Sequence, residues 1–417
     1  MTSLNLDGPI VTPSRIMHTT GCWFPKDRWR SPFRNLSFRV PVGVHHLRIE
    51  VSYLKTSEAA LDLGLRRGGL WLGWSGSELT SIDVGDTCAS PGYGVGLPPG
   101  DYSLILGLHR IPIEGLPYEI SIVVANPPTA CPSVGEVTQI VKAPPDPWSE
   151  HLDAGLGRTW RRGDLHVHSI HSDGAETPLE LGWRARASGL DYIAVTDHNT
   201  TSAAPELNAA AERTGVAMLL GQELTTDLGY ATVVGNASQF DFRQHPEQWL
   251  NGVSDGAIFV NHPTRLSGGW QAKTVARFPA AEIWNGSATL STADPVFRWW
   301  TQYGLDTVAV GGSGWHGPHG AITQLGQPTT WLAVQESEYE DAIRTGRVAV
   351  SKSPHGPAIL RNDDHVLVLA GEDCRVYSLA LESDIATGLD ANVARLDAVR
   401  GPLLLIADDG GVLGFCN

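Results

Sequence analysis

The chain has 417 residues, of which 42% are hydrophobic and 18% charged, and its formal net charge is −15. This composition excludes a disordered chain, and no run of about 18 apolar residues is present that would span a membrane. The acidic charge argues against nucleic acid as the main partner, because proteins that bind it need a basic face. A small phosphorylated substrate stays open, since metal ions can supply positive charge locally. The length predicts two or three domains.

The N-terminus shows no basic region followed by an apolar run, so no secretory signal is visible. The chain has five scattered cysteines, none in a C-x-x-C pair: Cys22, Cys88, Cys131, Cys374 and Cys416. We expect free thiols in a reducing compartment, not a disulfide framework or a zinc site. The sequence therefore predicts a cytoplasmic protein with a small-molecule substrate, no nucleic-acid partner and no membrane partner. Its oligomeric state cannot be read from the sequence.

Residues 1–125 alternate apolar and polar positions in short runs, such as Leu36–Val40, His46–Ser52 and Tyr118–Val124. Gly- and Pro-rich turns separate these runs, which predicts an antiparallel β-sandwich or jelly roll. The aromatic residues in its loops are compatible with a sugar-binding module, but packing is the favoured use. The Pro-rich, aperiodic stretch 126–157 is expected to be an extended linker.

Between 158 and 345, short apolar strands end in polar residues and alternate with helical segments. Thr177 is the expected N-cap of one helix, with Pro178 at its first position and Glu180 completing a capping box. Repeated strand–helix units with polar residues after each strand are typical of a β/α barrel, whose ligands gather at the C-terminal rim of the strands. Residues 346–417 return to strand patterns and predict a small β-rich segment.

His166 and His168 are separated by one residue at the end of a predicted strand, so their imidazoles share one face. Asp173, in the turn that follows, brings a carboxylate back over the strand end. Imidazole and carboxylate groups are ligands for zinc, manganese or iron. A single H-x-H is structural about as often as it binds metal. Here D-H, Q-E, N-H-P and W-H elements follow later strands, and together these five elements predict a metal site.

Six motifs occur in the order His166-Val-His168, Ser172-Asp-Gly174, Thr196–Asn199, Gly221–Glu223, Asn261–Pro263 and Gly312–His316. Together they resemble the PHP (polymerase and histidinol phosphatase) metallohydrolases over roughly 160–345. Leu72–Gly76 and Pro91–Tyr93 resemble the carbaryl-hydrolase-like branch of that family. The resemblance implies an α/β fold, a distorted PHP-type β/α barrel with an N-terminal antiparallel β-sandwich and a C-terminal β-rich segment. It also implies up to three divalent metal ions and hydrolysis of phosphoesters or, in the branch, aryl carbamates.

Carried over to this chain, the resemblance implies seven metal ligands: His166, His168, Asp173, His198, Glu223, His262 and His316. Glu223 would bridge a first metal, bound by the H-x-H pair, and a second metal bound by His262. Asp173, His198 and His316 would hold a third. The residues expected to take part in catalysis are His166, His168, Glu223, His262 and Asp197. Asp197 would hydrogen-bond a ligating imidazole, although a structural role is equally open.

Two positions depart from the family pattern. Tyr230 stands where the family usually has a histidine ligand of the second metal. Gly314 stands where it usually has an aspartate ligand of the first. A phenolate ligand would need a strong depression of its pKa from about 10. Of the one to three divalent ions that the pattern allows, we therefore expect one or two.

Four residues flank the expected ligands and are candidates for substrate binding: Arg265, Tyr230, Trp315 and His319. Arg265 could clamp an anionic group, although a solvated loop charge is as common. The sequence as a whole predicts a metal-dependent hydrolase that uses a metal-activated water on a phosphoester or a carbamate/ester bond. The alternative is a degenerate PHP module that binds a ligand or partner without turnover, as the losses at Tyr230 and Gly314 would suggest.

Overall fold

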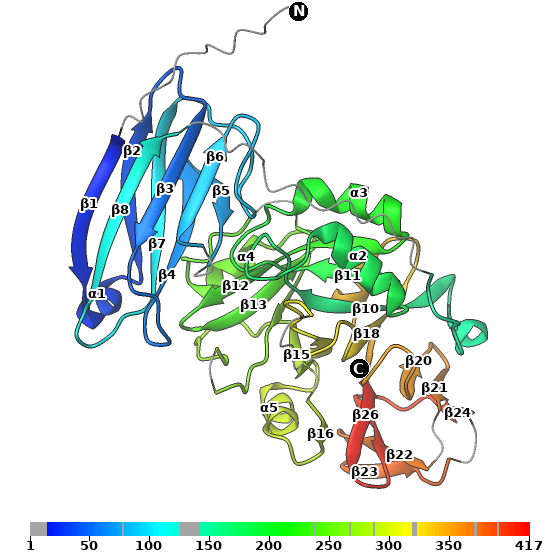
Figure 1. Cartoon of the computed structure of the whole chain (residues 1–417). Helices are drawn as coiled ribbons and strands as arrows, with labels where there is room; N and C mark the ends of the chain where they lie inside the picture. The colour runs from blue at the N-terminus through cyan, green and yellow to red at the C-terminus, as the bar shows by residue number, and fades with distance from the viewer. Residues whose placement is uncertain are drawn as a thin grey trace, which may run out of the picture. The chain divides into compact units, whose positions relative to one another are not determined.

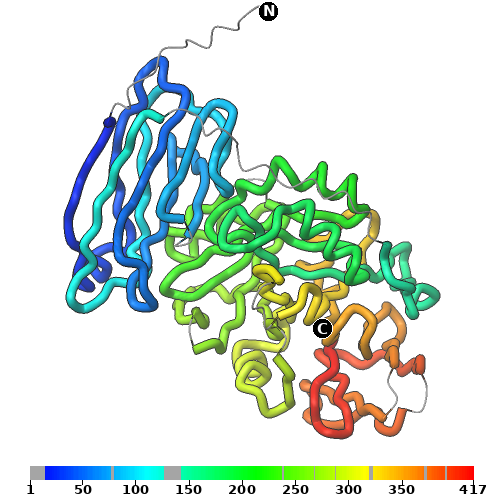
Figure 2. The backbone as a smooth tube through the Cα atoms, viewed as in Figure 1, coloured from blue at the N-terminus to red at the C-terminus, as the bar shows by residue number. Residues whose placement is uncertain are grey.

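The structure is a computed structural model that describes residues 15–76, 79–125, 142–236, 239–266, 268–286, 288–318, 323–370, 373–389 and 392–417. The chain divides into two compact units. The first consists of Met1–Gly135 with His171–Asp173, and the second of Glu136–Ile170 with Gly174–Asn417. Figure 2 traces the backbone through both. Within the described ranges, no helix is long and apolar enough to cross a membrane.

The first unit contains two four-stranded sheets with the strand orders β1-β8-β3-β6 and β2-β7-β4-β5 (Figure 1). Its elements are β1 (Arg15–Trp23), α1 (Pro25–Arg30), β2 (Phe33–Val40), β3 (His46–Ser52), β4 (Ala60–Arg67), β5 (Leu70–Trp74), β6 (Ser81–Gly85), β7 (Gly100–Arg110) and β8 (Leu116–Val124). Every pairing between these strands is antiparallel, which confirms the strand pattern predicted for this part of the chain.

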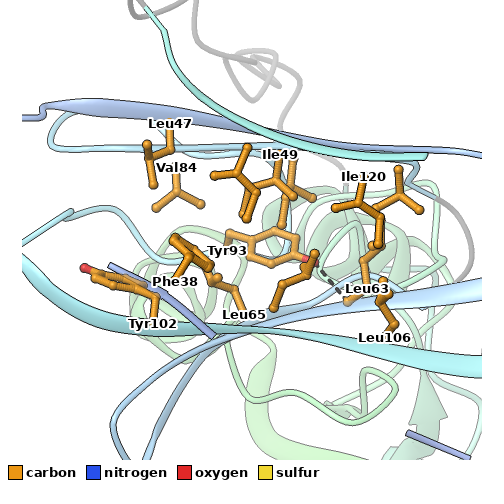
Figure 3. Close-up of a cluster of buried hydrophobic side chains, with 14 of the residues drawn as sticks. Phe38, Leu47, Ile49, Leu63, Leu65, Val84, Tyr93, Tyr102, Leu106 and Ile120 are labelled. Atoms are coloured by element: carbon orange, nitrogen blue, oxygen red, sulfur yellow. Dashed lines mark hydrogen bonds between the residues drawn. The ribbon is translucent and has the colours of Figure 1, made fainter. Parts of the chain in front are cut away.

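Alternate residues of the two sheets point inward and form the core of the sandwich, as the period of two along each strand requires. Figure 3 shows Leu47, Ile49, Val84 and Ile120 of one sheet facing Phe38, Leu63, Leu65, Tyr102 and Leu106 of the other, with Tyr93 among them. The Tyr93 hydroxyl donates to the carbonyl of Leu63 at 3.0 Å, and burial raises the pKa of this phenol. Tyr93, one of the aromatic residues of the loops, is thus part of the packed core.

The motif glycines of this unit are explained by close backbone approach. A β-carbon at Gly73 would collide with the carbonyl of Gly92 and would lie 2.6 Å from the ring of Tyr93. Gly92 itself has φ +82°, in the left-handed region that glycine tolerates best. Gly73 therefore packs directly against Gly92 and Tyr93, while the nearest atom to a β-carbon at Gly92 would be the carbonyl oxygen of His171, at 2.7 Å.

The cysteines differ from the expectation. Cys88 is disulfide-bonded, whereas Cys22, Cys374 and Cys416 are free. Cys131 lies outside the described residues. The prediction that all five cysteines are free thiols is wrong for Cys88, so the thiols no longer support a reducing compartment.

The second unit is built on one long sheet of strand order β17-β15-β14-β13-β12-β11-β10-β18-β19-β26-β25-β22-β23, with β9 and β16 paired at its sides. These strands are β9 (Asp153–Gly155), β10 (Arg158–Val167), β11 (Tyr192–Val195), β12 (Ala217–Thr226), β13 (Gly229–Val234), β14 (Ala257–Val260), β15 (Ala280–Asn285), β16 (Leu290–Ser291), β17 (Val308–Gly312), β18 (Thr329–Val334), β19 (Val348–Ser351), β22 (Cys374–Ser378), β23 (Ser383–Ala386), β25 (Leu403–Ala407) and β26 (Gly411–Cys416). Parallel pairs join β10 to β11, β11 to β12, β14 to β15 and β15 to β17.

The predicted closed barrel is not confirmed. Strand β10 is paired by β11 on one side and by β18 on the other, so only its C-terminal end is left to meet the segment that follows β17. Among the described residues this meeting consists of a single bridge between Val167 and Trp315, supported by the His168 N–H bond to the carbonyl of Trp315. The hydrogen-bonded ladder between named strands stays open.

Helices pack on this sheet, with α2 and α3 side by side (Figure 1). The helices of the second unit are η1 (Ser149–His151), α2 (Pro178–Ala187), α3 (Ala204–Thr214), α4 (Pro246–Gly252), α5 (Pro295–Tyr303) and α6 (Tyr339–Arg344). The capping box predicted at Thr177 is confirmed: its hydroxyl accepts from the Glu180 N–H, and the Glu180 carboxylate accepts from the Thr177 N–H.

The C-terminal part of the chain, orange to red in Figure 2, is rich in strands, as expected for 346–417. Strands β20 (Ala358–Arg361), β21 (His365–Leu369) and β24 (Val393–Asp397) form a separate three-stranded sheet. The remaining strands extend the long sheet through β19 and β26.

Candidate metal centre

The motif residues meet because neighbouring strands of the sheet end close together. His166 lies in β10 and His168 directly after it, while His198 follows β11 and His262 follows β14. Glu223 was expected to follow the end of a strand, but β12 continues to Thr226. The reason is that residues 221–226 pair antiparallel with β13, so Glu223 projects from inside a strand.

Glu223 is the centre of the arrangement, with four imidazoles around its carboxylate. The distances to its Oε1 are 3.2 Å from His166 Nε2 and 3.7 Å from His262 Nε2. The distances to its Oε2 are 2.8 Å from His198 Nδ1 and 3.5 Å from His168 Nε2. Asn261 Nδ2 also donates to Oε1 at 2.6 Å. No lysine or arginine of the described residues pairs with this carboxylate, so all the nearby positive charge would come from imidazoles or a bound ion.

Burial sets the electrostatics of this group. The side chains of Glu223, His168 and His166 are 1%, 0% and 4% exposed. Burial alone would raise the pKa of Glu223, but His166 and His198 outweigh it and hold that pKa well below its ordinary range. Burial alone would lower the pKa of His166, yet Glu223 and Glu282 raise it well above its ordinary value. Opposite charges are therefore stabilised inside the same dry site.

Two groups of side chains have ligand atoms within 4.8 Å of one another, as a metal ion would need: His166, His168 and Glu223 in one, and His168, Asp173, His198 and His316 in the other. We call them the buried group and the outer group. They share His168, whose ring lies 4.1 Å from that of His316 and 4.4 Å from that of His198. The buried group has no exposed member, whereas His316 of the outer group is exposed.

The donor set fits a borderline divalent metal. Imidazole nitrogens and carboxylate oxygens are what zinc, manganese and iron accept. Nδ1 of His262 is buried with no hydrogen-bond partner among the described residues, so a donor atom is available beside the buried group. Converging imidazoles around a buried carboxylate cost desolvation energy, which a bound cation would offset.

Sequence reasoning missed three buried side chains that hold this site together. Glu282 contacts His166 Nδ1 at 2.9 Å and accepts from the backbone N–H of His262 at 2.9 Å. Asp164 accepts from the N–H groups of His166, Ser313 and Gly326 at 2.8–3.1 Å. Asn261, the third, bonds Glu223 as described. The signal in the sequence for Glu282 is a charged residue inside an otherwise largely apolar strand, whereas Asp164 lies in a strand that also carries three arginines.

Asp197 contacts the residue that follows His168 in the chain, and its expected bond to a ligating imidazole stays a prediction. Its carboxylate is buried and accepts from the N–H of Ser169 at 2.8 Å and from its hydroxyl at 2.7 Å. Ser169 follows His168 in the chain. Asp197 thus anchors the turn after the H-x-H pair.

Two of the residues expected to bind substrate lie beside the groups. The ring of Tyr230 stands edge-on to His262 at 5.3 Å and to His198 at 6.1 Å. Arg265 is exposed, and its guanidinium lies 3.5 Å from the side-chain oxygen of Asn285. Their roles in binding substrate stay predictions.

The other two expected substrate residues lie differently. The indole N–H of Trp315 donates to Glu176 at 2.8 Å, and Arg184 lies over the ring at 5.2 Å. Trp315 lines a cavity of about 440 Å³ whose lining includes none of the seven expected ligands. His319 lies outside the described residues. His171, in the same turn as Asp173, is buried.

Gly314 occupies the position where the family carboxylate is missing. Its φ is +59°, and a β-carbon there would lie 3.5 Å from Nδ2 of Asn285. Asn285 Nδ2 in turn donates to the Glu282 carboxylate at 3.1 Å. A side chain at position 314 would therefore contact Asn285, which is bound to Glu282 in β15. The loop therefore has room for a small side chain at this position.

Comparison with known proteins agrees with this site. Residues 164–261 match the family model of the PHP domain. The chain is 46% identical over 70 residues to a 3',5'-nucleoside bisphosphate phosphatase of Chromobacterium violaceum, which covers 17% of this chain and 25% of that protein. It is 39% identical over 67 residues to a 5'-3' exoribonuclease of Haemophilus influenzae, covering 16% and 24%. The chain thus spans about a quarter of these relatives.

Among solved structures, the chain is similar to a two-domain protein from Bacteroides vulgatus that contains a predicted PHP-like metal-dependent phosphoesterase. The TM-score is 0.40 at 19% sequence identity, over 67% of this chain and 98% of that one. Residues 164–261 are thus similar to the PHP domain, and this stretch contains five of the seven expected metal ligands: His166, His168, Asp173, His198 and Glu223.

Proposed function

We propose that this protein hydrolyses phosphoester bonds of small molecules with divalent metal ions bound at the buried and outer groups. The observation that carries the proposal is Glu223, a buried carboxylate with four imidazole nitrogens at 2.8–3.7 Å and no arginine or lysine partner in the described chain. When bound, divalent ions would act as Lewis acids toward a phosphoryl oxygen and lower the pKa of a water nucleophile.

Different residues of the site would bind metal and bind the substrate. His166, His168, Glu223 and His262 would hold metal at the buried end of the site. Asp173, His198 and His316 would hold metal at the outer end, where His316 is exposed. Arg265 would attract the anionic substrate, since its guanidinium is exposed and tied to the site only through Asn285. Tyr230, between His198 and His262, would contact the substrate at the position where relatives of the family pattern carry an imidazole.

A phosphoester is the favoured substrate because two of the relatives are a nucleoside bisphosphate phosphatase and an exoribonuclease. The names 3',5'-nucleoside bisphosphate phosphatase and 5'-3' exoribonuclease both describe cleavage at phosphorus. The carbamate or ester alternative rests on the motifs at Leu72–Gly76 and Pro91–Tyr93. Those motifs include Gly73 and Tyr93, whose contacts are accounted for by packing within the sandwich, and Gly92, which lies against the backbone carbonyl of His171.

The test is hydrolysis by protein stripped with a chelator and reloaded with manganese, zinc or iron(II). Adenosine 3',5'-bisphosphate and p-nitrophenyl phosphate would report cleavage as inorganic phosphate, bis-p-nitrophenyl phosphate as p-nitrophenol, and an aryl N-methylcarbamate as the released phenol. We expect cleavage of phosphoesters only by loaded protein, and its loss in Glu223→Gln. Glu247→Gln is the control, because Glu247 accepts from the N–H groups of Val275 and Ala276 and touches no candidate ligand. Cleavage of the carbamate alone would show that the protein is a carbamate or ester hydrolase and not a phosphoesterase. Metal binding without any turnover would favour the binding module.

A further inference from the structure

Glu282 is a charged residue where the strand pattern calls for an apolar one. It lies in β15 between Ala281 and Ile283, which are 0% and 2% exposed, and its own side chain is 0% exposed. Leaving a carboxylate in such a place without full hydrogen bonding would cost several kcal/mol. The hydrogen-bond partners of the Glu282 carboxylate therefore indicate its role.

Three donors satisfy this carboxylate, and two of them belong to expected metal ligands. Oε1 lies 2.9 Å from His166 Nδ1 and accepts from Asn285 Nδ2 at 3.1 Å. Oε2 accepts from the backbone N–H of His262 at 2.9 Å. Both side-chain oxygens of residue 282 thus accept hydrogen bonds. A carboxylate can do this, whereas the amide of glutamine has only one acceptor oxygen.

The contact with His166 fixes which nitrogen faces the site. With Nδ1 turned to Glu282, the opposite nitrogen, Nε2, faces Glu223 at 3.2 Å. A ring nitrogen that donates to a carboxylate leaves the other nitrogen with its lone pair directed at the metal position and prevents rotation of the ring. Glu282 thereby sets both the tautomer and the orientation of His166.

The contact with His262 holds an unusual backbone. The φ angle of His262 is +27°, outside the regions that non-glycine residues normally adopt. Such a conformation persists only where surrounding structure enforces it. The bond from the His262 N–H to Glu282 is one such constraint, and it directs the imidazole that lies 3.7 Å from Glu223 Oε1.

We infer that Glu282 is a positioning residue of the metal centre, which aligns His166 through its ring and His262 through its backbone so that both face Glu223. It acts through those two residues and makes no direct contact with substrate. This inference rests on the metal centre of the proposed function.

The test compares Glu282→Gln with wild type by competition against a fluorescent chelator for zinc or manganese. We expect metal affinity to fall about 10- to 100-fold, the range found for lost partners of metal-ligating histidines. Glu247→Gln, which also removes a carboxylate that accepts from backbone N–H groups, should leave affinity unchanged. Circular dichroism and the urea midpoint would report whether each variant is folded.

A second readout is the proton on Nδ1 of His166, which can be observed in the wild-type protein itself. In zinc-loaded wild type labelled with ¹⁵N-histidine, the Nδ1 proton of His166 should give a downfield, slowly exchanging signal, assigned by its loss in His166→Gln. Its disappearance in Glu282→Gln would support the inference. Unchanged affinity in Glu282→Gln, or an Nδ1 of wild-type His166 that carries no protected proton, would overturn it while leaving the metal centre intact. Failure of wild type to bind any metal would overturn both the inference and the proposed function.

Discussion

Two of the contacts between a buried histidine and a carboxylate have the same length but different surroundings. In the sandwich, His46 Nε2 lies 2.9 Å from Asp83 Oδ1, and His46 is 1% exposed. In the second unit, His166 Nδ1 lies 2.9 Å from Glu282 Oε1, and His166 is 3% exposed. The distances are equal and both imidazoles are buried, but the Asp83 side chain is 19% exposed whereas that of Glu282 is 0% exposed.

Their surroundings differ. Asp83 is also held by the guanidinium of Arg48, with contacts of 3.1 Å to each carboxylate oxygen, so its charge is balanced by a fixed cation. On the other side of His166 stands Glu223, whose neighbours are imidazoles and an amide. A fixed arginine completes a structural ion pair, whereas a buried carboxylate surrounded only by histidines leaves a place for a metal ion. The number of converging imidazoles, and not any single pair, marks the functional site.

The largest effect should come from the histidine that the two metal groups share. We expect His168→Ala to reduce bound metal to less than about a tenth of the wild-type content, because both groups lose a ligand. His316→Ala should lose only the metal of the outer group. Metal per chain, measured by inductively coupled plasma mass spectrometry after reconstitution, checks both. Equal losses in the two variants would contradict the division into a buried and an outer group.

The structural pair should respond in the opposite way. His46→Ala should lower the free energy of unfolding by about 2–4 kcal/mol, through the lost hydrogen bond and the cavity left behind. Metal content should not change, because His46 belongs to the sandwich. Urea denaturation followed by metal analysis tests both statements. Loss of metal in His46→Ala would show that the two histidine–carboxylate pairs are not distinct in function.

A carboxylate added at Gly314 should strengthen the buried group. Because the β-carbon position is open to within 3.5 Å of Asn285, we expect Gly314→Asp to bind metal more tightly than wild type. The left-handed φ should cost about 1–3 kcal/mol of stability, near the low end for aspartate, which tolerates this region. Chelator competition and thermal unfolding measure the two effects. Gly314→Ala is the matched control, with the same strain and no ligand.

The smallest effect concerns the acid side of the structural pair. Burial raises the pKa of Asp83, but Arg48 and His46 outweigh it and lower that pKa below its ordinary value. The stabilisation is therefore present above about pH 4 and is lost as the pH falls through the lower pKa of the folded state. Urea midpoints at pH 5.5 and pH 3 should show a loss in wild type that is about 1 kcal/mol larger than in Asp83→Asn. Equal losses would mean that the pair contributes nothing.

The ligand residues were predictable because their chemistry is visible in short motifs. Strand ends in a sheet gather at one edge, so His166, His168, His198 and His262 were expected near one another and the structure brings them together. The capping box at Thr177 was predictable for the same reason, since its partners are three residues apart.

What was not predictable depends on long-range contacts. Glu282 is the one acidic residue of strand β15, and Asp164 is the one acidic residue of strand β10, which also carries three arginines. Their partners are 116 and up to 162 residues away. The extension of β12 past Glu223 follows from its pairing with β13, which the apolar run alone does not reveal. Closure of the barrel and the state of Cys88 likewise depend on which segments meet in space, so the sequence pattern gave the wrong expectation for the cysteine.

The measurement that decides most is equilibrium metal binding to wild type and to Glu223→Gln, both stripped with a chelator and titrated with manganese, zinc and iron(II). Glutamine keeps the shape of Glu223 but removes the charge that four imidazoles surround. We predict at least one tightly bound ion per wild-type chain and a metal affinity that is more than about 100-fold lower in Glu223→Gln. This loss exceeds the range found when a hydrogen-bond partner of a metal ligand is removed. A wild-type protein that binds none of these ions, or a variant that binds them equally well, would contradict the assignment of this cluster as a metal centre.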